Sequence, residues 1–159
     1  MPREPLHGRL TTVRPVDDAD VDLLLAWHAD PGVSRYWDDE VPSREELLAD
    51  LARPEVDAYI VEAGGRPVGF LQAWFEGELS GLDMFLEPRA RGRGLGPDAA
   101  RALATWLRDH GLVARLIVDP YLWNDPAIRA WERAGFRAVD VREPDDDRRD
   151  RWVEMEFHG

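Results

Sequence analysis

The stretch from residue 82 to residue 110 restricts the fold of this chain more than any other part of the sequence. Residues 82–86 read L-D-M-F-L, as in a strand, and residues 94–110 repeat apolar side chains at helical spacing, with Gly111 directly beyond. Between them, residues 91–96 read R-G-R-G-L-G. Glycines let the main chain approach a ligand closely, and a helix N-terminus attracts anions. The segment therefore predicts a strand, a turn and a helix that bind a phosphate or pyrophosphate.

The composition excludes several other kinds of site. All 20 basic residues are arginines, so neither a Walker P-loop nor a Schiff-base lysine can form. Without cysteine, no thiolate can carry an acyl group or bind zinc, and the four histidines are isolated, so we expect no metal site. The G-x-G-x-G spacing at mid-chain fits a dinucleotide fingerprint poorly. From spacing alone, an ordinary glycine-rich turn between a strand and a helix remains the alternative.

The remaining pattern predicts an α/β fold, with helices on the faces of a mixed sheet and a single domain over residues 1–159. Gly64-Gly65 between two apolar runs is a strong hairpin signal. We expect strands at 9–15, 58–63, 67–75, 82–86, 116–118, 136–141 and 152–157.

Capping signals predict where the other helices begin. Asp17, Ser43 and Asn124 each precede an apolar periodic run, and Pro126 is expected as the first residue of the last helix. Residues 30–32, D-P-G, are expected to end the first helix. The charged stretch 143–151 is expected to be an exposed hairpin loop, because it is too polar for a core.

The charge of the chain restricts its partners. A formal net charge of −12 argues against nucleic acid and favours a cationic partner, although acidity also serves solubility alone. Residues 17–57 are strongly acidic, whereas residues 89–93 are basic. The sequence has no apolar run of 18 residues and no signal-peptide pattern at its start, so we expect no membrane contact and a cytoplasmic location. Both a monomer and a homodimer remain open.

A second motif points to a family. Residues 124–136 read N-D-P-A-I-R-A-W-E-R-A-G-F. Together with R-G-R-G-L-G, this segment resembles the GNAT acyltransferase superfamily, which has an R-x-x-G-x-G pyrophosphate motif and an N-x-x-A-x-x-x-Y-x-x-x-G-F helix beside the pantetheine arm. The resemblance implies a mostly antiparallel sheet of about seven strands with about four helices, and acetyl-CoA bound between strands that splay near 82–86 and 115–119. The implied cofactor-binding residues are Phe85, Leu86, Arg91, Gly92, Arg93, Gly94, Leu95, Gly96, Asn124, Ala127 and Trp131.

Two shorter segments resemble one branch of this superfamily. G-L-D-M-F-L at 81–86 and V-D-P at 118–120 resemble the aminoglycoside 6'-N-acetyltransferase branch, although amine and siderophore acetyltransferases share parts of both. This branch implies direct acetyl transfer, in a ternary complex, to a primary amine of a small cationic substrate such as an aminoglycoside. A protein or peptide N-acetyltransferase and a non-catalytic acyl-CoA-binding module remain alternatives. The implied substrate-binding residues are Trp37, Gln72, Trp74, Asp83 and Asp119.

Asp83 and Asp119 are the candidate catalytic residues. An ammonium has no lone pair until a proton leaves, so the reaction needs a base. Asp83 lies in a half-buried predicted strand, where burial would raise the pKa of its carboxyl towards neutrality; otherwise it faces solvent or caps a turn. Asp119 follows a buried strand and either binds amines of the substrate or begins a turn.

The sequence departs from the superfamily at Trp131, where other members often have a tyrosine that protonates the departing thiolate. An indole N–H is not a useful acid at neutral pH, so we expect Trp131 to pack. Tyr121 or water then supplies the proton, or the thiolate leaves unaided. Trp37, Trp74 and Trp123 are expected near the cleft, because flat indole faces suit sugar rings and cations.

Overall fold

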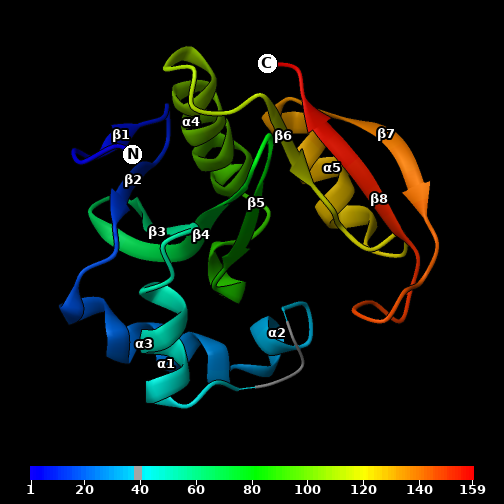
Figure 1. The fold of residues 1–159 in the computed structure, drawn as a ribbon. Coiled ribbons are helices and arrows are strands. Elements are labelled where there is room, and N and C mark those ends of the chain that lie inside the picture. Colours follow the sequence, from blue (N-terminus) through cyan, green and yellow to red (C-terminus); the bar gives the residue numbers. More distant parts are fainter. Residues whose placement is uncertain (38–40) are drawn as a thin grey trace.

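The chain folds around one eight-stranded sheet in the computed structural model, which describes residues 1–37 and 41–159 (Figure 1). The strand order is β1-β2-β3-β4-β5-β6-β8-β7, and every neighbouring pair is antiparallel except β5 and β6. The expected mixed, mostly antiparallel sheet is confirmed. The strands are β1 Leu6–His7, β2 Thr12–Pro15, β3 Val56–Ala63, β4 Arg66–Glu76, β5 Leu79–Leu86, β6 Arg115–Val118, β7 Phe136–Arg142 and β8 Trp152–Phe157.

The extra strand lies at the N-terminal end: β2 begins at Thr12, later than the strand expected at 9–15, and β1 lies before that range. The backbone N–H groups of Arg9, Leu10 and Thr11 donate to the carboxylate of Asp98, at 2.9, 3.0 and 3.0 Å. Gly8 N also donates to Thr11 O at 2.9 Å, which closes a turn. Because these amides are bound to Asp98, they do not join the ladder, and β1 and β2 form separate strands.

The described residues form five α-helices: α1 Val21–Ala29, α2 Pro31–Ser34, α3 Arg44–Leu51, α4 Leu95–Asp109 and α5 Asp125–Ala134. Short 3-10 turns lie at Asp18–Asp20 and Pro88–Ala90. The capping box at Ser43 is confirmed, because its hydroxyl accepts from Glu46 N at 3.1 Å and the Glu46 carboxylate accepts from Ser43 N at 3.2 Å.

The expectation that residues 30–32 end the first helix is confirmed, and the same residues also begin a short helix that was not predicted. α1 does end there, but Asp30 Oδ1 accepts from Gly32 N at 2.8 Å and caps the short helix α2. Pro31 is at the first position of α2, where the missing N–H costs no hydrogen bond. The same three residues therefore both end α1 and begin α2.

The helices cover both faces of the sheet. Ile60, Phe70 and Phe85 belong to one apolar cluster with buried residues of α1, α2 and α3. Tyr59 and Leu71, which alternate with Ile60 and Phe70, belong to the cluster that contains α4 and α5. The alternation of neighbouring strand residues between two cores follows from the pleat. Among the described helices, none is long and apolar enough to cross a membrane.

The sheet parts between β5 and β6. The two strands pair only from Leu79 to Gly81 with 115–117, although β5 continues to Leu86. The expected splay of these strands is confirmed. β5 also begins at Leu79, earlier than expected, so the turn before it is shorter. α4 follows one of the parted strands and the segment leading to α5 follows the other, so residues from both halves of the chain meet at this point.

Candidate active site

The glycine-rich turn at 91–96 connects β5 to α4. Gly92 and Gly94 both have a φ of 77°, in the left-handed region that other residues rarely adopt, and Gly94 is the N-cap of α4. Gly96 is needed for packing, because a Cβ there would lie 3.0 Å from Cε of Met84 on β5. No side chain within the described ranges caps α4. Pro97 has no N–H and Asp98 N donates to Gly94 O at 3.3 Å, so the N–H groups of Leu95 and Gly96 are the ones in the first turn that are left for an anion.

A cavity of about 430 Å³ lies between this turn and α5. It is lined by Phe85, Leu86, Arg91, Gly92, Gly94, Leu95, Gly96, Asn124, Ala127 and Trp131, which are all but one of the predicted cofactor-binding residues. The exception is Arg93. It lines a different groove, beside Trp27 and Arg89, so the structure does not bring its charge to this cavity.

Arg91 holds the turn against two other segments. Its Nη2 donates to Gly32 O at 2.6 Å and to Leu86 O at 3.1 Å, and its guanidinium lies over the ring of Tyr36, 5.6 Å from the centroid. The sequence suggested only that Arg91 adds positive charge near an anion. The structure shows that its donors also fasten the α2 segment to the end of β5.

The helix α5 forms the opposite wall of the cavity. Asn124 Oδ1 accepts from Ala127 N at 3.3 Å and caps the helix, while Pro126 is the second helical residue instead of the first. Trp131 is only 7% exposed and its ring meets Phe136 edge-on, with centroids 5.4 Å apart. The indole packs as expected, and it also faces the cavity.

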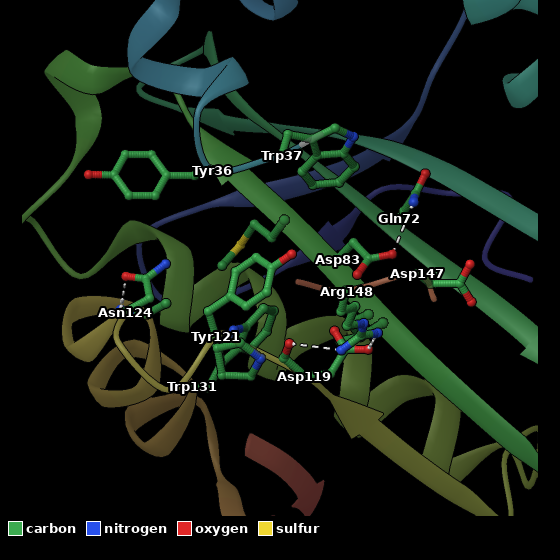
Figure 2. A pocket seen from close by; sticks show the side chains of 14 residues that line it. Tyr36, Trp37, Gln72, Asp83, Asp119, Tyr121, Asn124, Trp131, Asp147 and Arg148 are labelled. Carbon is green, nitrogen blue, oxygen red and sulfur yellow. Dashed lines mark hydrogen bonds and ion pairs between the residues drawn. The ribbon is translucent and has the colours of Figure 1, made fainter. Parts of the chain in front are cut away.

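A second cavity, of about 330 Å³, collects side chains predicted for the acceptor side (Figure 2). Trp37, Gln72, Asp83 and Asp119 line it. Gln72 and Asp83 are opposite one another on β4 and β5, and Gln72 Nε2 donates to Asp83 Oδ2 at 3.1 Å. Trp74 is a correction to the prediction: it lies outside this lining, with its indole covering Gly81.

The two cavities adjoin, and five residues line both of them: Tyr36, Met84, Asn124, Ala127 and Trp131. We call these five residues the shared wall. The shared residues come from the α2 segment, from β5 and from α5, so the wall lies where the sheet parts. Groups bound in the two cavities would therefore meet beside Met84 and Trp131.

The loop 143–151 does more than the sequence indicated. Most of it is exposed, as expected, but Asp147 and Arg148 line the second cavity, and Arg148 Nη2 donates to Asp119 Oδ2. The strand order explains why this loop lies beside Asp119. β8 pairs with β6, so the loop that precedes β8 must lie beside the end of β6, where Asp119 follows.

An aromatic group lies at the mouth of the second cavity. Trp123 is 51% exposed and stacks on Tyr121, with centroids 5.4 Å apart and planes 12° apart. The ring of Tyr36 also lies near Trp123, with centroids 6.2 Å apart. Both tyrosines line the cavity, so the expectation of Trp123 near the cleft is met through them.

Residues 17–143 match the family model described as an acetyltransferase (GNAT) domain. The chain belongs to the GNAT acetyltransferase family. It is 30% identical to aminoglycoside N(6')-acetyltransferase type 1 of Klebsiella pneumoniae, over 84% of this chain and 78% of that protein. It is 28% identical to the peptidyl-lysine N-acetyltransferase YiaC of Escherichia coli, over 76% of this chain and 74% of that protein. A solved structure of AAC(6')-Ib with ribostamycin and coenzyme A is 25% identical, has a TM-score of 0.81 and matches 93% of each chain.

As a GNAT protein, the chain is an N-acetyltransferase that takes its acetyl group from acetyl-CoA. The first cavity fits that donor, because an uncapped helix N-terminus and a glycine turn suit a pyrophosphate. Along α5, Ala127, Ala130 and Trp131 offer apolar contacts to an extended arm, and Arg129 and Arg133 add positive charge beside the anion. Within the described residues, no group of three or more His, Asp or Glu is placed to hold a metal ion.

Proposed function

We propose that this GNAT enzyme acetylates a primary amine of a small cationic acceptor of the aminoglycoside kind, by direct transfer in a ternary complex. The observation that carries the proposal is the wall shared by the two cavities. Three carboxylates, those of Asp83, Asp119 and Asp147, line the acceptor side and favour an ammonium. Similarity to aminoglycoside N(6')-acetyltransferase type 1 supports this class of acceptor.

Asp83 is the base in this proposal. It takes a proton from the acceptor ammonium, and the freed nitrogen attacks the thioester carbonyl of acetyl-CoA. Collapse of the tetrahedral intermediate breaks the C–S bond and yields the acetamide and the CoA thiolate. Gln72 orients the carboxylate through the 3.1 Å hydrogen bond to Oδ2. Asp119 lines the same cavity and binds an amine of the acceptor only where Arg148, its partner in the free protein, is displaced.

The thiolate must then take up a proton. Trp131 stands where many superfamily members have tyrosine, and its indole N–H is a poor acid. Tyr121 lines the acceptor cavity and carries a phenol, so it is the side chain proposed for this step, with water as the other donor. In this proposal Trp131 lines both cavities at the point where the two substrates meet.

The turn at 91–96 holds the pyrophosphate of acetyl-CoA in this proposal. The N–H groups at the start of α4 bind the anion, and Asn124, Ala127 and Trp131 line the path of the pantetheine arm. Phe85 and Leu86 lie on β5 beyond the end of its pairing with β6, and they line the cavity there, where the Leu86 carbonyl accepts from Arg91. Arg91 contributes mainly by fastening the turn.

Thiol release from acetyl-CoA tests the proposal against a panel of amines: kanamycin, the monoamine sugar 6-amino-6-deoxyglucose, and a lysine-containing peptide. We expect kcat/KM for the amino sugars to exceed that for the peptide by about tenfold or more, because the acceptor cavity is small and acidic. Mass spectrometry of the products should find one acetyl group on the amine.

A peptide lysine is the second candidate acceptor, because the chain is also similar to a peptidyl-lysine acetyltransferase. A preference for the peptide in the same panel would replace the amino-sugar proposal with this one. Binding of acetyl-CoA without thiol release for any of the amines would contradict both and favour a non-catalytic acyl-CoA-binding protein.

A further inference from the structure

We propose that Arg148 sets the acceptor specificity of this enzyme by acting as an internal cation on the Asp119 carboxylate. The proposal rests on the proposed function, since it concerns the acceptor cavity of that reaction. Its starting point is that the position suited to a second ammonium of the acceptor is already taken by a side chain of the protein.

Arg148 makes several contacts in this position (Figure 2). Nη2 donates to Asp119 Oδ2, Nη1 lies 3.4 Å from Asp119 O, and the guanidinium carbon lies 4.5 Å from the centroid of the Trp152 ring. The side chains of Arg148 and Asp119 are 29% and 22% exposed, so the pair is partly shielded from water. An arginine held by a carboxylate and stacked on an indole is far better fixed than a surface ion pair.

The loop is folded so that it presents this arginine. Asp145 Oδ1 accepts from the backbone N–H groups of Asp147 and Arg148, each at 2.9 Å, and Asp145 N donates to Arg148 O at 3.0 Å. These bonds close a tight turn at the tip of the loop.

The base of the loop is anchored as well. Leu122 N donates to Arg151 O at 2.8 Å, and Trp123 Nε1 donates to Asp150 Oδ2 at 3.1 Å. The segment that carries Arg148 is therefore tied to the residues that follow Asp119 along the chain. Because the loop is already fixed, holding the guanidinium in the cavity requires little further loss of backbone entropy.

The carboxylates of Asp83 and Asp119 therefore differ in their partners. Asp83 accepts a hydrogen bond from Gln72, whereas Asp119 forms an ion pair with Arg148. An acceptor with one ammonium can reach Asp83 and leave the Arg148 pair intact. An acceptor with several ammonium groups must displace Arg148 to use Asp119, or place its second cation beside that guanidinium, where the remaining lining carboxylate, Asp147, is exposed to water. Arg148 therefore disfavours polycations relative to monoamines.

Replacement of the arginine tests this inference. We expect Arg148→Met to tighten the binding of kanamycin, a polycation, by about tenfold or more, because a carboxylate is released. Binding of 6-amino-6-deoxyglucose should change by less than about threefold. Arg148→Lys, which keeps the cation, should remain within about threefold of the natural protein for both. Dissociation constants come from titration calorimetry, which needs no turnover.

Arg151→Met is the matched control, because it removes the same charge from the same loop but outside the cavity, where Arg151 pairs with the exposed Glu143. It should leave both affinities within about twofold. In an Asp119→Asn background, Arg148→Met should give no gain for kanamycin. Thermal melts of each variant, and Arg148→Gln as a second uncharged replacement, separate a specific effect from unfolding.

Unchanged or weaker binding of kanamycin to folded Arg148→Met and Arg148→Gln would overturn the inference, as would an equal gain in Arg151→Met. These outcomes differ from failure of the proposed function, which would appear as no thiol release with any amine. Tighter kanamycin binding without acetylation would support the role of Arg148 and reject the proposed reaction.

Discussion

Asp83 is the residue on which the proposed chemistry depends. It lies on β5 in the acceptor cavity, with Gln72 bonded to one of its oxygens. We expect Asp83→Asn to lower kcat by a factor of about 10² or more, because an amide cannot take the proton from the ammonium. The KM for acetyl-CoA should change little, since the turn at 91–96 is untouched. Steady-state kinetics with an accepted amine measure both constants.

Asp140→Asn is the control for this variant, because it removes the same charge from an exposed position on β7. It should retain the activity of the natural protein. Full turnover by Asp83→Asn would remove Asp83 from the role of base, whatever the behaviour of the control.

Asp57 is a residue whose charge opposes folding. Burial raises the pKa of its carboxyl, which lies on β3 two residues before the buried Tyr59. A raised pKa means that the stabilising contribution is present below the pKa of the unfolded chain and is lost as the pH rises through the folded value. We expect Asp57→Asn to raise Tm at pH 7 by roughly 2–4 °C.

The same substitution should have no effect on Tm near pH 3, where the carboxyl is protonated in both states. Thermal melts of the natural protein and the variant at both pH values measure this difference. A variant that is less stable at pH 7 would mean that the charge of Asp57 is well compensated in the fold.

At the scale of elements, the first turn of α4 depends on a distant hairpin. The Asp98 carboxylate accepts from three backbone N–H groups of the β1–β2 turn and from the Thr11 hydroxyl at 2.7 Å. We expect Asp98→Ala to lower the free energy of unfolding by about 1–3 kcal/mol, because four donors lose their acceptor. Asp109→Ala, at the other end of α4, should change it much less, as its partner Arg108 is exposed. Chemical denaturation measures both.

The pH dependence of this contact has the opposite sign to that of Asp57. Burial alone would raise the pKa of Asp98, but the hydrogen bonds from Thr11, Leu10 and Arg9 outweigh it, and the pKa is lowered. A lowered pKa gives stability that is present above the unfolded value and is lost as the pH falls through the folded one. The difference between the natural protein and Asp98→Ala should therefore shrink below about pH 4. A difference that stays constant at low pH would contradict this.

The elements that the sequence predicts well are those with local signals. α4 and α5 begin and end at glycine, asparagine and proline positions that act within a few residues, and the Gly64-Gly65 hairpin forms where it is expected. The strand expected at 9–15 is correct from Thr12 onward, but residues 9–11 form a turn because their amides donate to Asp98, which is nearly ninety positions away in sequence. α2 is missed because a stop signal and a start signal coincide at 30–32.

The residues of the candidate site can also be divided into those with a local sequence signal and those without one. The glycine turn and Asn124 are recognised from their own motifs, and they do line the cofactor cavity. Arg93 and Trp74 share a motif with lining residues but do not line the two cavities: Arg93 lines another groove, and the Trp74 indole covers Gly81. The sequence motif alone does not show this difference. Arg148 is missed because its partner Asp119 is reached through the pairing of β8 with β6, and a loop composition does not reveal such a pairing.

At the scale of the whole molecule, we propose that residues 1–159 form one domain. Both apolar clusters are built on the same central strands, so neither can persist when the sheet is lost. We therefore expect a single unfolding transition in denaturant, coincident in far-UV circular dichroism and tryptophan fluorescence. Two resolved transitions would mean that the α1–α3 side and the α4–α5 side unfold separately.

The central claim is that the two substrates meet where the two cavities adjoin, and that the acetyl group passes directly from one substrate to the other. Initial rates of thiol release, measured while acetyl-CoA and an accepted amino sugar are varied together, test it most directly. Direct transfer predicts double-reciprocal lines that intersect, and no acetyl group left on the protein after incubation with acetyl-CoA alone. Parallel lines with an acetylated protein, or no thiol release at any concentration of amine, would contradict the account.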